Sequence, residues 1–188
     1  MNLYSTPRLY LRTWRDSDMI PFAAINADAR VMRYFPAVLS QAQSHALAER
    51  IRSQMARDGY GLWIVEAKDS GEVIGIVGLQ QVDLTLPFAP AVEIAWRLAW
   101  RFQGQGIATE AAARVLQIAE PDFGLSSIIA FTASVNKPSL RVMEKIGMHY
   151  ERDFAHPRLP VNDPLSLHCL YRFSATSSFK TIRPDGAK

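Results

Sequence analysis

The sequence has few of the residues that build cross-linked or metal-centred proteins. Only one of its 188 residues is a cysteine, Cys169, so neither an internal disulfide framework nor a four-cysteine zinc site can form. The four histidines lie far apart in the sequence, without the spacing of a helical ligand pair. We therefore expect no metal site, and a reducing compartment fits this composition best.

Long apolar runs and blocks of like charge are also missing. The chain nowhere has about 18 consecutive apolar residues, the usual minimum for a membrane-spanning helix, and residues 1–5 contain no basic stretch that leads into an apolar run. Its 21 basic and 18 acidic residues are scattered and give a net charge of +3. We expect a cytoplasmic protein with neither a membrane nor a nucleic-acid partner.

The residues that are plentiful are those that fill a core. Hydrophobic residues make up 48% of the chain and aromatic residues 10%, which is enough for one substantial core. The last residues are polar and have little to bury. The sequence therefore predicts a single domain over residues 1–174 and a flexible tail over residues 175–188.

The periodicity of apolar residues predicts alternating strands and helices. Strands are expected at 9–14, 61–66, 73–82, 91–98, 128–134, 149–154 and 166–173, and helices after residue 18, at 40–57, after Gly106 up to residue 120, where Pro121-Asp122-Phe123-Gly124 breaks the helix, and at 138–147. This order implies a mixed sheet with helices on its faces.

The most informative stretch is a glycine pair, Gly104 and Gly106, between the strand at 91–98 and the helix that follows. Glycines let the backbone approach a ligand closely, and the free amides of a first helical turn attract phosphate. The stretch is neither a Walker loop nor a three-glycine dinucleotide motif. A tight turn that packs a strand on a helix explains the glycines equally well.

Two segments resemble motifs of one enzyme family. Residues 103–108, Gln-Gly-Gln-Gly-Ile-Ala, resemble the Gln/Arg-x-x-Gly-x-Gly/Ala motif with which the GCN5-related N-acetyltransferases (GNAT) grip the pyrophosphate of coenzyme A. Residues 136–148 resemble that family's segment of an asparagine, a helix and Glu-Lys-x-Gly. Residues 6–12 and 93–96 are similar to the ribosomal-protein acetyltransferase branch, so the resemblance covers residues 3–173.

The resemblance implies a fold and an activity. The fold would be α/β, with a central, mostly antiparallel, splayed sheet of about six to seven strands flanked by helices. The activity would be transfer of the acetyl group of acetyl-CoA to a primary amine, in a protein N-terminus or a small molecule, by direct attack in a ternary complex. The partners would be coenzyme A and the amine acceptor, and the enzyme a monomer or homodimer. Loops 31–40, 82–90 and 155–163 are where we expect the acceptor to be selected.

The resemblance also implies which residues would hold the cofactor. Backbone groups of Arg97, Leu98 and Ala99 would bind pantetheine and polarise the thioester. The other cofactor-binding candidates are Gln103, Gly104, Gln105, Gly106, Ile107, Ala108 and Thr109 at the pyrophosphate, Asn136 and Ser139 at the pantetheine, and Lys137 and Arg141 at the 3′-phosphate. Asn136 is alternatively a turn or cap residue, and Lys137 and Arg141 ordinary surface charges.

Catalysis needs a base for the amine and an acid for the leaving thiolate. Glu93 is the candidate base, through a water, with a surface or salt-bridged glutamate as the alternative. Many family members place a tyrosine acid where this chain has Met143, and a thioether cannot donate a proton. Ser139, or a water, is then the candidate donor, unless the helix backbone already satisfies its hydroxyl.

Two other functions remain open at this stage. A non-catalytic acyl-CoA-binding regulator on the same fold would keep the phosphate loop without the chemistry. A protein-interaction domain would use the glycine pair only as a structural turn.

Overall fold

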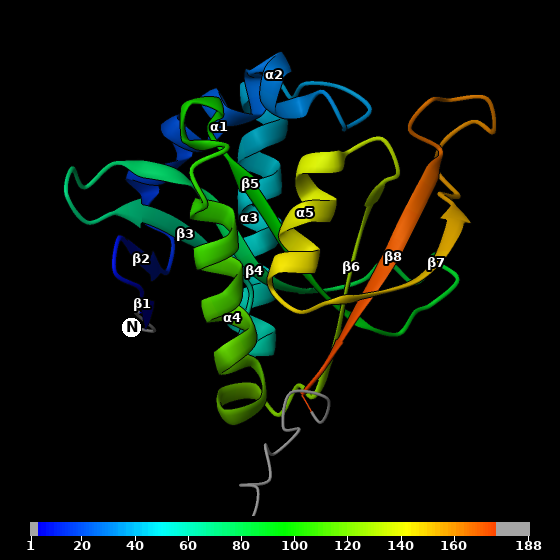
Figure 1. The fold of residues 1–188 in the computed structure, drawn as a ribbon. Coiled ribbons are helices and arrows are strands. Elements are labelled where there is room, and N and C mark those ends of the chain that lie inside the picture. The colour runs from blue at the N-terminus through cyan, green and yellow to red at the C-terminus, as the bar shows by residue number, and fades with distance from the viewer. Residues whose placement is uncertain (1–3, 176–188) are drawn as a thin grey trace, which may run out of the picture.

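The computed structural model describes residues 4–175, which form one sheet with helices on both faces (Figure 1). The elements are, in chain order, β1 (Tyr4–Ser5), β2 (Leu9–Arg12), η1 (Asp16–Asp18), α1 (Met19–Ala27), α2 (Ala29–Met32), α3 (Gln41–Asp58), β3 (Leu62–Ala67), β4 (Val73–Gln81), β5 (Val92–Leu98), η2 (Trp100–Phe102), α4 (Ile107–Phe123), β6 (Ser127–Ala133), α5 (Lys137–Lys145), β7 (His149–Ala155) and β8 (Leu167–Ser174). The expected tail lies outside the described residues, Ala175 excepted.

The sheet confirms the predicted mixed fold. Its strand order in the described chain is β1-β2-β3-β4-β5-β6-β8-β7, and every neighbouring pair is antiparallel except β5 and β6. The two-residue strand β1 brings the number of strands to eight, one more than the upper end of the expectation.

The sheet opens between β5 and β6. The parallel ladder between them contains one register pair, Glu93 with Ile129, whereas β4 and β5 pair from Gly75–Leu98 to Gln81–Val92. Figure 1 shows β5 and β6 diverging toward their upper ends. The sheet is therefore two half-sheets, β1 to β5 and β6 to β7, that separate beyond Glu93.

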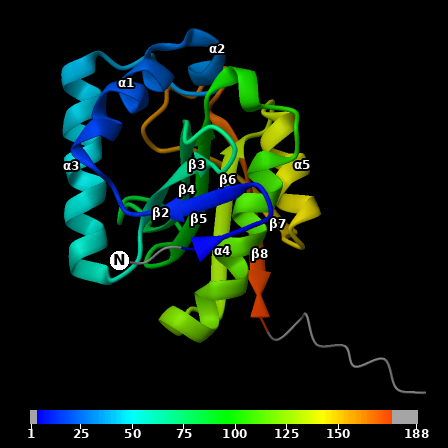
Figure 2. The ribbon, with the colours of Figure 1, turned by 90° about the vertical axis from the view of Figure 1, so that its left-hand side faces the viewer.

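The helices divide between the two faces. In Figure 2 the sheet lies between α3 on one side and α4 with α5 on the other. Ile94 and Leu98 of β5 pack in the same core cluster as α4, whereas Ala95 packs with Phe22 of α1 and Ala48 of α3. Because side chains alternate along a strand, the odd-numbered residues of β5 face the α1 and α3 side.

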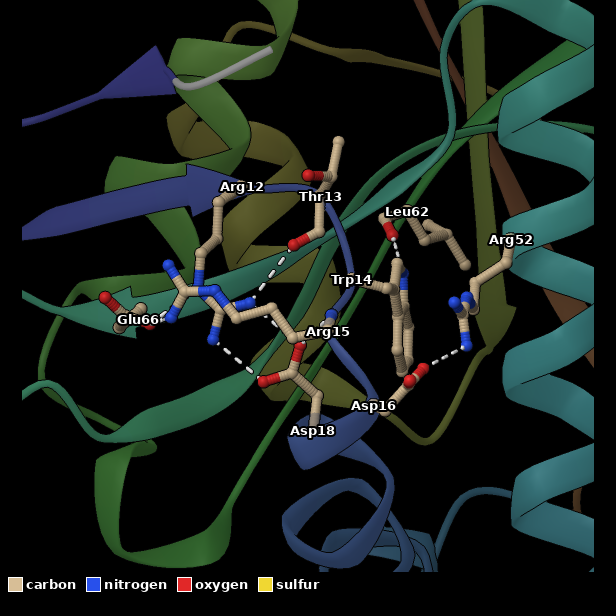
Figure 3. Close-up of polar contacts among 9 residues, drawn as sticks. All are labelled: Arg12, Thr13, Trp14, Arg15, Asp16, Asp18, Arg52, Leu62 and Glu66. Atoms are coloured by element: carbon tan, nitrogen blue, oxygen red, sulfur yellow. Dashed lines mark hydrogen bonds and ion pairs between the residues drawn. The ribbon is translucent and has the colours of Figure 1, made fainter. Parts of the chain in front are cut away.

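A buried ion cluster fixes α1 on the sheet (Figure 3). The Arg12 guanidinium donates to both oxygens of Asp18 at 2.8 Å and to Glu66 at 2.5 Å, and the side chains of all three are mostly shielded from solvent. Nearby, Trp14 Nε1 donates to the Leu62 carbonyl at 2.7 Å. Arg15 also lies 3.3 Å from Glu66, so two guanidinium groups compensate the two carboxylates.

Helix ends follow local chemistry. Ser40 and Gln43 form a reciprocal capping box at the start of α3, and Gly59, with φ +77°, ends that helix. The short α2 was not predicted. It begins at Asp28, whose side chain accepts from the Arg30 amide at 2.9 Å.

The break expected over residues 121–124 occurs at Gly124, the last of them, so the helix is three residues longer than expected. Helix α4 runs through Pro121 to Phe123 and ends at Gly124, whose amide bonds back to Ala119 and Glu120. A proline in the last turn removes only one backbone donor, and the left-handed φ of +68° at Gly124 is the stronger stop. Among residues 4–175, no helix has both the length and the apolar composition needed to cross a membrane.

Candidate active site

A cavity of ≈ 1070 Å³ occupies the opening between β5 and β6. One end is lined by the start of α4 and by α5. The other end is lined by the segment after α2, by α3 and by the loop between β7 and β8. Loops 31–40 and 155–163 thus contribute to the wall, whereas none of residues 82–90 does.

The glycine pair forms the turn that starts α4. Gly104 and Gly106 have φ of +75° and +78°, which side chains with a Cβ rarely adopt, and Gly106 is the N-cap of the helix. The amides of Ile107, Ala108 and Thr109 donate to no described residue, and the first helical bond is made by Glu110. These three amides and the helix dipole form a site suited to phosphate.

Contacts from outside the loop hold it in place. Gln103 Nε2 donates to the Leu98 carbonyl at 3.0 Å, and Gln105 Nε2 to the Arg101 carbonyl at 2.7 Å. Arg8 donates to the Gln105 carbonyl at 3.1 Å and pairs with Glu110 at 2.6 Å. The bracing by Arg8 was not predicted, because it joins positions about a hundred residues apart and has no local sequence signal.

On the side of the opening, the end of β5 has unpaired backbone groups, apart from the Leu98 carbonyl, which accepts from Gln103 Nε2. The Ala99 amide donates to the Ile74 carbonyl at 2.8 Å, so the alternation of an antiparallel ladder turns the backbone groups of Leu98 and Trp96 away from β4. The ladder to β6 has already ended at Glu93. Of the three predicted backbone positions, Leu98 therefore faces the opening. The Arg97 backbone faces β4, and Ala99 is not among the lining residues.

Asn136 is the N-cap of α5. Its Oδ1 accepts from the Ser139 amide at 3.3 Å, and its Nδ2 donates to Thr132 Oγ1 at 2.8 Å. The alternative role of a helix cap is therefore present in the structure. Asn136 also lines the cavity, so capping and cofactor binding are compatible.

Ser139 lies one turn into α5 and lines the same cavity. Its hydroxyl makes no hydrogen bond to a described residue, so the helix backbone does not satisfy it as the alternative required. Met143, in the slot where a tyrosine acid was looked for, is 1% exposed and packs in the main core. Its thioether still lines part of the cavity.

Glu93 is buried in the wall of the cavity. Its carboxylate accepts from Gln80 Nε2 across the β4–β5 ladder, and it forms no ion pair within residues 4–175. Burial raises the pKa of Glu93 to about 7, and the Gln80 hydrogen bond partly opposes that rise. It is neither the surface nor the salt-bridged glutamate of the alternative interpretation.

The remaining cofactor candidates divide by position. Gln103, Gly104, Gly106, Ile107, Ala108, Thr109 and Arg141 line the cavity, whereas Gln105 and Lys137 do not. Lys137 is exposed. Only one of the two charges expected at a 3′-phosphate therefore belongs to the cavity wall.

The far end of the cavity contains side chains that sequence reasoning did not select. The His156 and His168 rings lie 4.9 Å apart beside Phe131, and burial lowers the pKa of both histidines. The Arg97 guanidinium lies over the Phe35 ring at 4.3 Å, and burial lowers its pKa to about 10. No group of three or more His, Cys, Asp or Glu residues in the described part of the chain could hold a metal ion.

Comparison with known proteins identifies the family to which the chain belongs. The family described as "Acetyltransferase (GNAT) domain" matches residues 8–149. The uncharacterised protein YkkB of Bacillus subtilis (strain 168) is 32% identical over 159 residues, which cover 83% of this chain and 90% of YkkB.

Solved structures share the fold at lower identity. The GNAT-family acetyltransferase from Bacillus anthracis superposes with a TM-score of 0.78 at 23% identity, covering 93% of this chain and 99% of that one. RimL, the ribosomal L7/L12 alpha-N-protein acetyltransferase, solved in complex with coenzyme A, gives 0.76 at 16% identity, covering 92% and 98%.

Proposed function

Because the chain belongs to the GNAT acetyltransferase family, we propose that it transfers the acetyl group of acetyl-CoA to a primary amine by direct attack in a ternary complex. The observation that supports this most strongly is that one cavity joins the free amides of α4 to the buried carboxylate of Glu93. The first group suits the pyrophosphate of coenzyme A, and the second suits proton removal from an amine.

The cofactor end binds through backbone. The amides of Ile107, Ala108 and Thr109 hold the pyrophosphate, and the backbone groups of Trp96 and the amide of Leu98 pair with pantetheine. This extended arm enters the opening where β6 has separated from β5. The thioester carbon is thereby brought between the two half-sheets, beside Glu93 and Ser139.

The reaction then needs two proton transfers. Glu93, directly or through a water, accepts a proton from the amine, which attacks the thioester carbon and forms the C–N bond. A free amide on the open side of β5 stabilises the oxyanion. The C–S bond breaks, and Ser139 or a water returns a proton to the thiolate of coenzyme A. A pKa of about 7 is well matched to the base, because Glu93 is then ionised near neutral pH while remaining basic.

A non-catalytic acyl-CoA-binding regulator is the competing proposal, and one observation favours it. Met143 occupies the slot of the usual tyrosine acid and is buried. The regulator would bind acetyl-CoA through the same loop but release no thiol.

Release of free thiol from acetyl-CoA, measured with a panel of primary amines and N-terminal peptides, tests the proposal. We expect amine-dependent thiol release and a matching acetylated product by mass spectrometry. Tight acetyl-CoA binding with no turnover on any acceptor would leave the regulator as the function. Failure of coenzyme A to raise the melting temperature would reject both and favour the structural role of the loop.

A further inference from the structure

We infer that the acceptor bears an anionic group, a carboxylate or a phosphate, which Arg97 binds at the end of the cavity away from α4. This rests on the proposed acetyltransferase function. It assigns the Arg97 side chain to the acceptor, whereas the predicted role of this residue was limited to its backbone.

The first step is the position of the side chain. Arg97 and Glu93 are both odd-numbered residues of β5 and share its α1 and α3 face, while α4 and its free amides lie on the opposite face. Arg97 lines the cavity there, together with Phe35 and Arg33 from the segment after α2. The cofactor phosphates and the Arg97 guanidinium are therefore on different sides of the strand.

The second step is to identify which nitrogen atoms of the Arg97 guanidinium already have a hydrogen-bond partner. Its face is covered by the Phe35 ring, 4.3 Å from Cζ, and Nη1 donates to Asn26 Oδ1 at 2.5 Å. Asn26 is itself fully buried and held by Ser44. Nε is buried without a partner, and Nη2 donates to no described residue. The edge made by Nε and Nη2 is the one that binds a carboxylate or phosphate in a bidentate manner.

The third step is the missing counter-ion. Arg12, the buried arginine of the sheet, faces the carboxylates of Asp18 and Glu66. Arg97 forms no ion pair with any residue from 4 to 175, and burial lowers its pKa to about 10. A shielded guanidinium without a counter-ion destabilises the protein by itself. An anion delivered by a ligand would supply the missing partner.

The distance along the strand limits the acceptor. Arg97 lies four positions after Glu93, so their Cα atoms are roughly 13 Å apart at about 3.3 Å per residue. The amine at Glu93 and the anion at Arg97 are therefore several bonds apart in the preferred acceptor.

A series of ω-amino carboxylates with one to six methylenes, each compared with its carboxamide, tests this. We expect the carboxylate of the best length to exceed its carboxamide at least tenfold in kcat/KM. The ratio should fall to about one in Arg97→Met and be partly kept in Arg97→Lys, which keeps the charge but not the fork. The matched ω-aminoalkyl phosphonates show whether phosphate or carboxylate is preferred.

Arg33→Met is the matched control, because it removes a charge from the same cavity wall, where Arg33 lies over the Tyr34 ring and has no fixed hydrogen bond to a carboxylate. The carboxylate preference should survive it. Equal loss in Arg33→Met and Arg97→Met would overturn the inference in favour of diffuse attraction, and so would equal use of carboxylates and carboxamides by the wild type.

A second readout does not depend on turnover. Calorimetry of the coenzyme A-loaded protein with the same compounds measures the preference as a ratio of dissociation constants. If no amine is acetylated but the carboxylate still binds at least tenfold more tightly in an Arg97-dependent way, the proposed function fails and the anion site stands. If amines are acetylated without any such preference, the anion site fails and the proposed function stands.

Discussion

The two ends of the cavity are built in different ways. The cofactor end is a short continuous stretch, from Gln103 to Thr109, that offers backbone amides at the start of one helix. The acceptor end collects side chains from four separate segments, among them Phe35, Arg97, His156 and His168. A ligand common to a whole family can be held by backbone, which tolerates substitution. A ligand particular to one protein is recognised by side chains that the fold gathers from distant positions.

The largest effect on activity is expected when the candidate base, Glu93, is removed. We expect Glu93→Gln to lower kcat by roughly 10²- to 10⁴-fold with little change in coenzyme A affinity, because the base is lost and the phosphate loop is not. In the wild type the rate should fall as the pH drops below about 7, where Glu93 becomes protonated, and this limb should disappear in the variant. A pH–rate profile unchanged by Glu93→Gln would exclude it as the base.

Two further measurements test the role assigned to Glu93. Gln80→Leu removes a hydrogen bond that lowers the pKa of Glu93, so the acidic limb should move to higher pH. The folded-state pKa of Glu93 is above its ordinary value, so the stability it gives in its protonated form is lost as the pH rises through about 7. Glu93→Gln should therefore gain melting temperature relative to the wild type between pH 5 and pH 8.

A substitution at the cofactor end should have the opposite pattern. Gly106→Asp is expected to weaken coenzyme A binding at least 100-fold while the fold persists, because a carboxylate at the N-cap would take the α4 amides that the pyrophosphate needs. Calorimetry with coenzyme A measures the loss. Near-native affinity in this variant would refute the phosphate-loop assignment.

The matched pair Gly106→Ala and Gly124→Ala separates strain from binding. Both glycines have left-handed φ, +78° and +68°, and a Cβ at either would meet no atom closer than 3.7 Å. Each substitution should cost about 1–2 kcal/mol of stability. Only the first should weaken coenzyme A binding, since Gly124 lies at the other end of α4.

The proton donor lies between the two ends, and its effect should be intermediate. Ser139→Ala should lower kcat about 10²-fold with little change in the affinity for acetyl-CoA if the hydroxyl protonates the thiolate. Steady-state kinetics distinguish this from a binding role, in which KM rises and kcat stays nearly constant. Wild-type values for both constants would leave water as the donor.

The smallest effect is expected at Asn136. Asn136→Ala should weaken coenzyme A binding by about 1 kcal/mol, the scale of one hydrogen bond, and cost about as much stability through the lost cap of α5. Asn136→Asp keeps the cap acceptor but not the amide donor. Calorimetry distinguishes the two roles. If binding weakens in the alanine variant and not in the aspartate variant, the loss of affinity is due to the lost cap alone.

Much of the fold could be predicted from local chemistry. Ser40 with Gln43 marks the start of α3, and the alternation in residues 91–98 marks β5. The glycine pair likewise identified the loop before α4, because a positive φ and a free helix end are properties of a few adjacent residues. The family motifs then implied a mostly antiparallel, splayed sheet, but not its strand order.

The acceptor end could not be predicted in the same way. The pKa of Glu93 depends on burial by neighbouring elements and on Gln80 of another strand, which no pattern around residue 93 encodes. Asn26 meets Arg97 across seventy-one positions of sequence, and Arg8 braces the loop from the far end of the chain. Helix α4 was expected to end at residue 120 and continues to Phe123, because the cost of a proline depends on how close it lies to the helix end.

The single register pair between β5 and β6 makes the opening a wedge with its vertex at Glu93. In a wedge, displacement of the walls grows with distance from the vertex, so any widening that admits a ligand moves α5 and the outer ends of both strands most. Glu93, the candidate base, therefore lies where the walls of the opening are displaced least. Its carboxylate can keep one orientation toward the reacting carbon while the surrounding walls adjust to acceptors of different size.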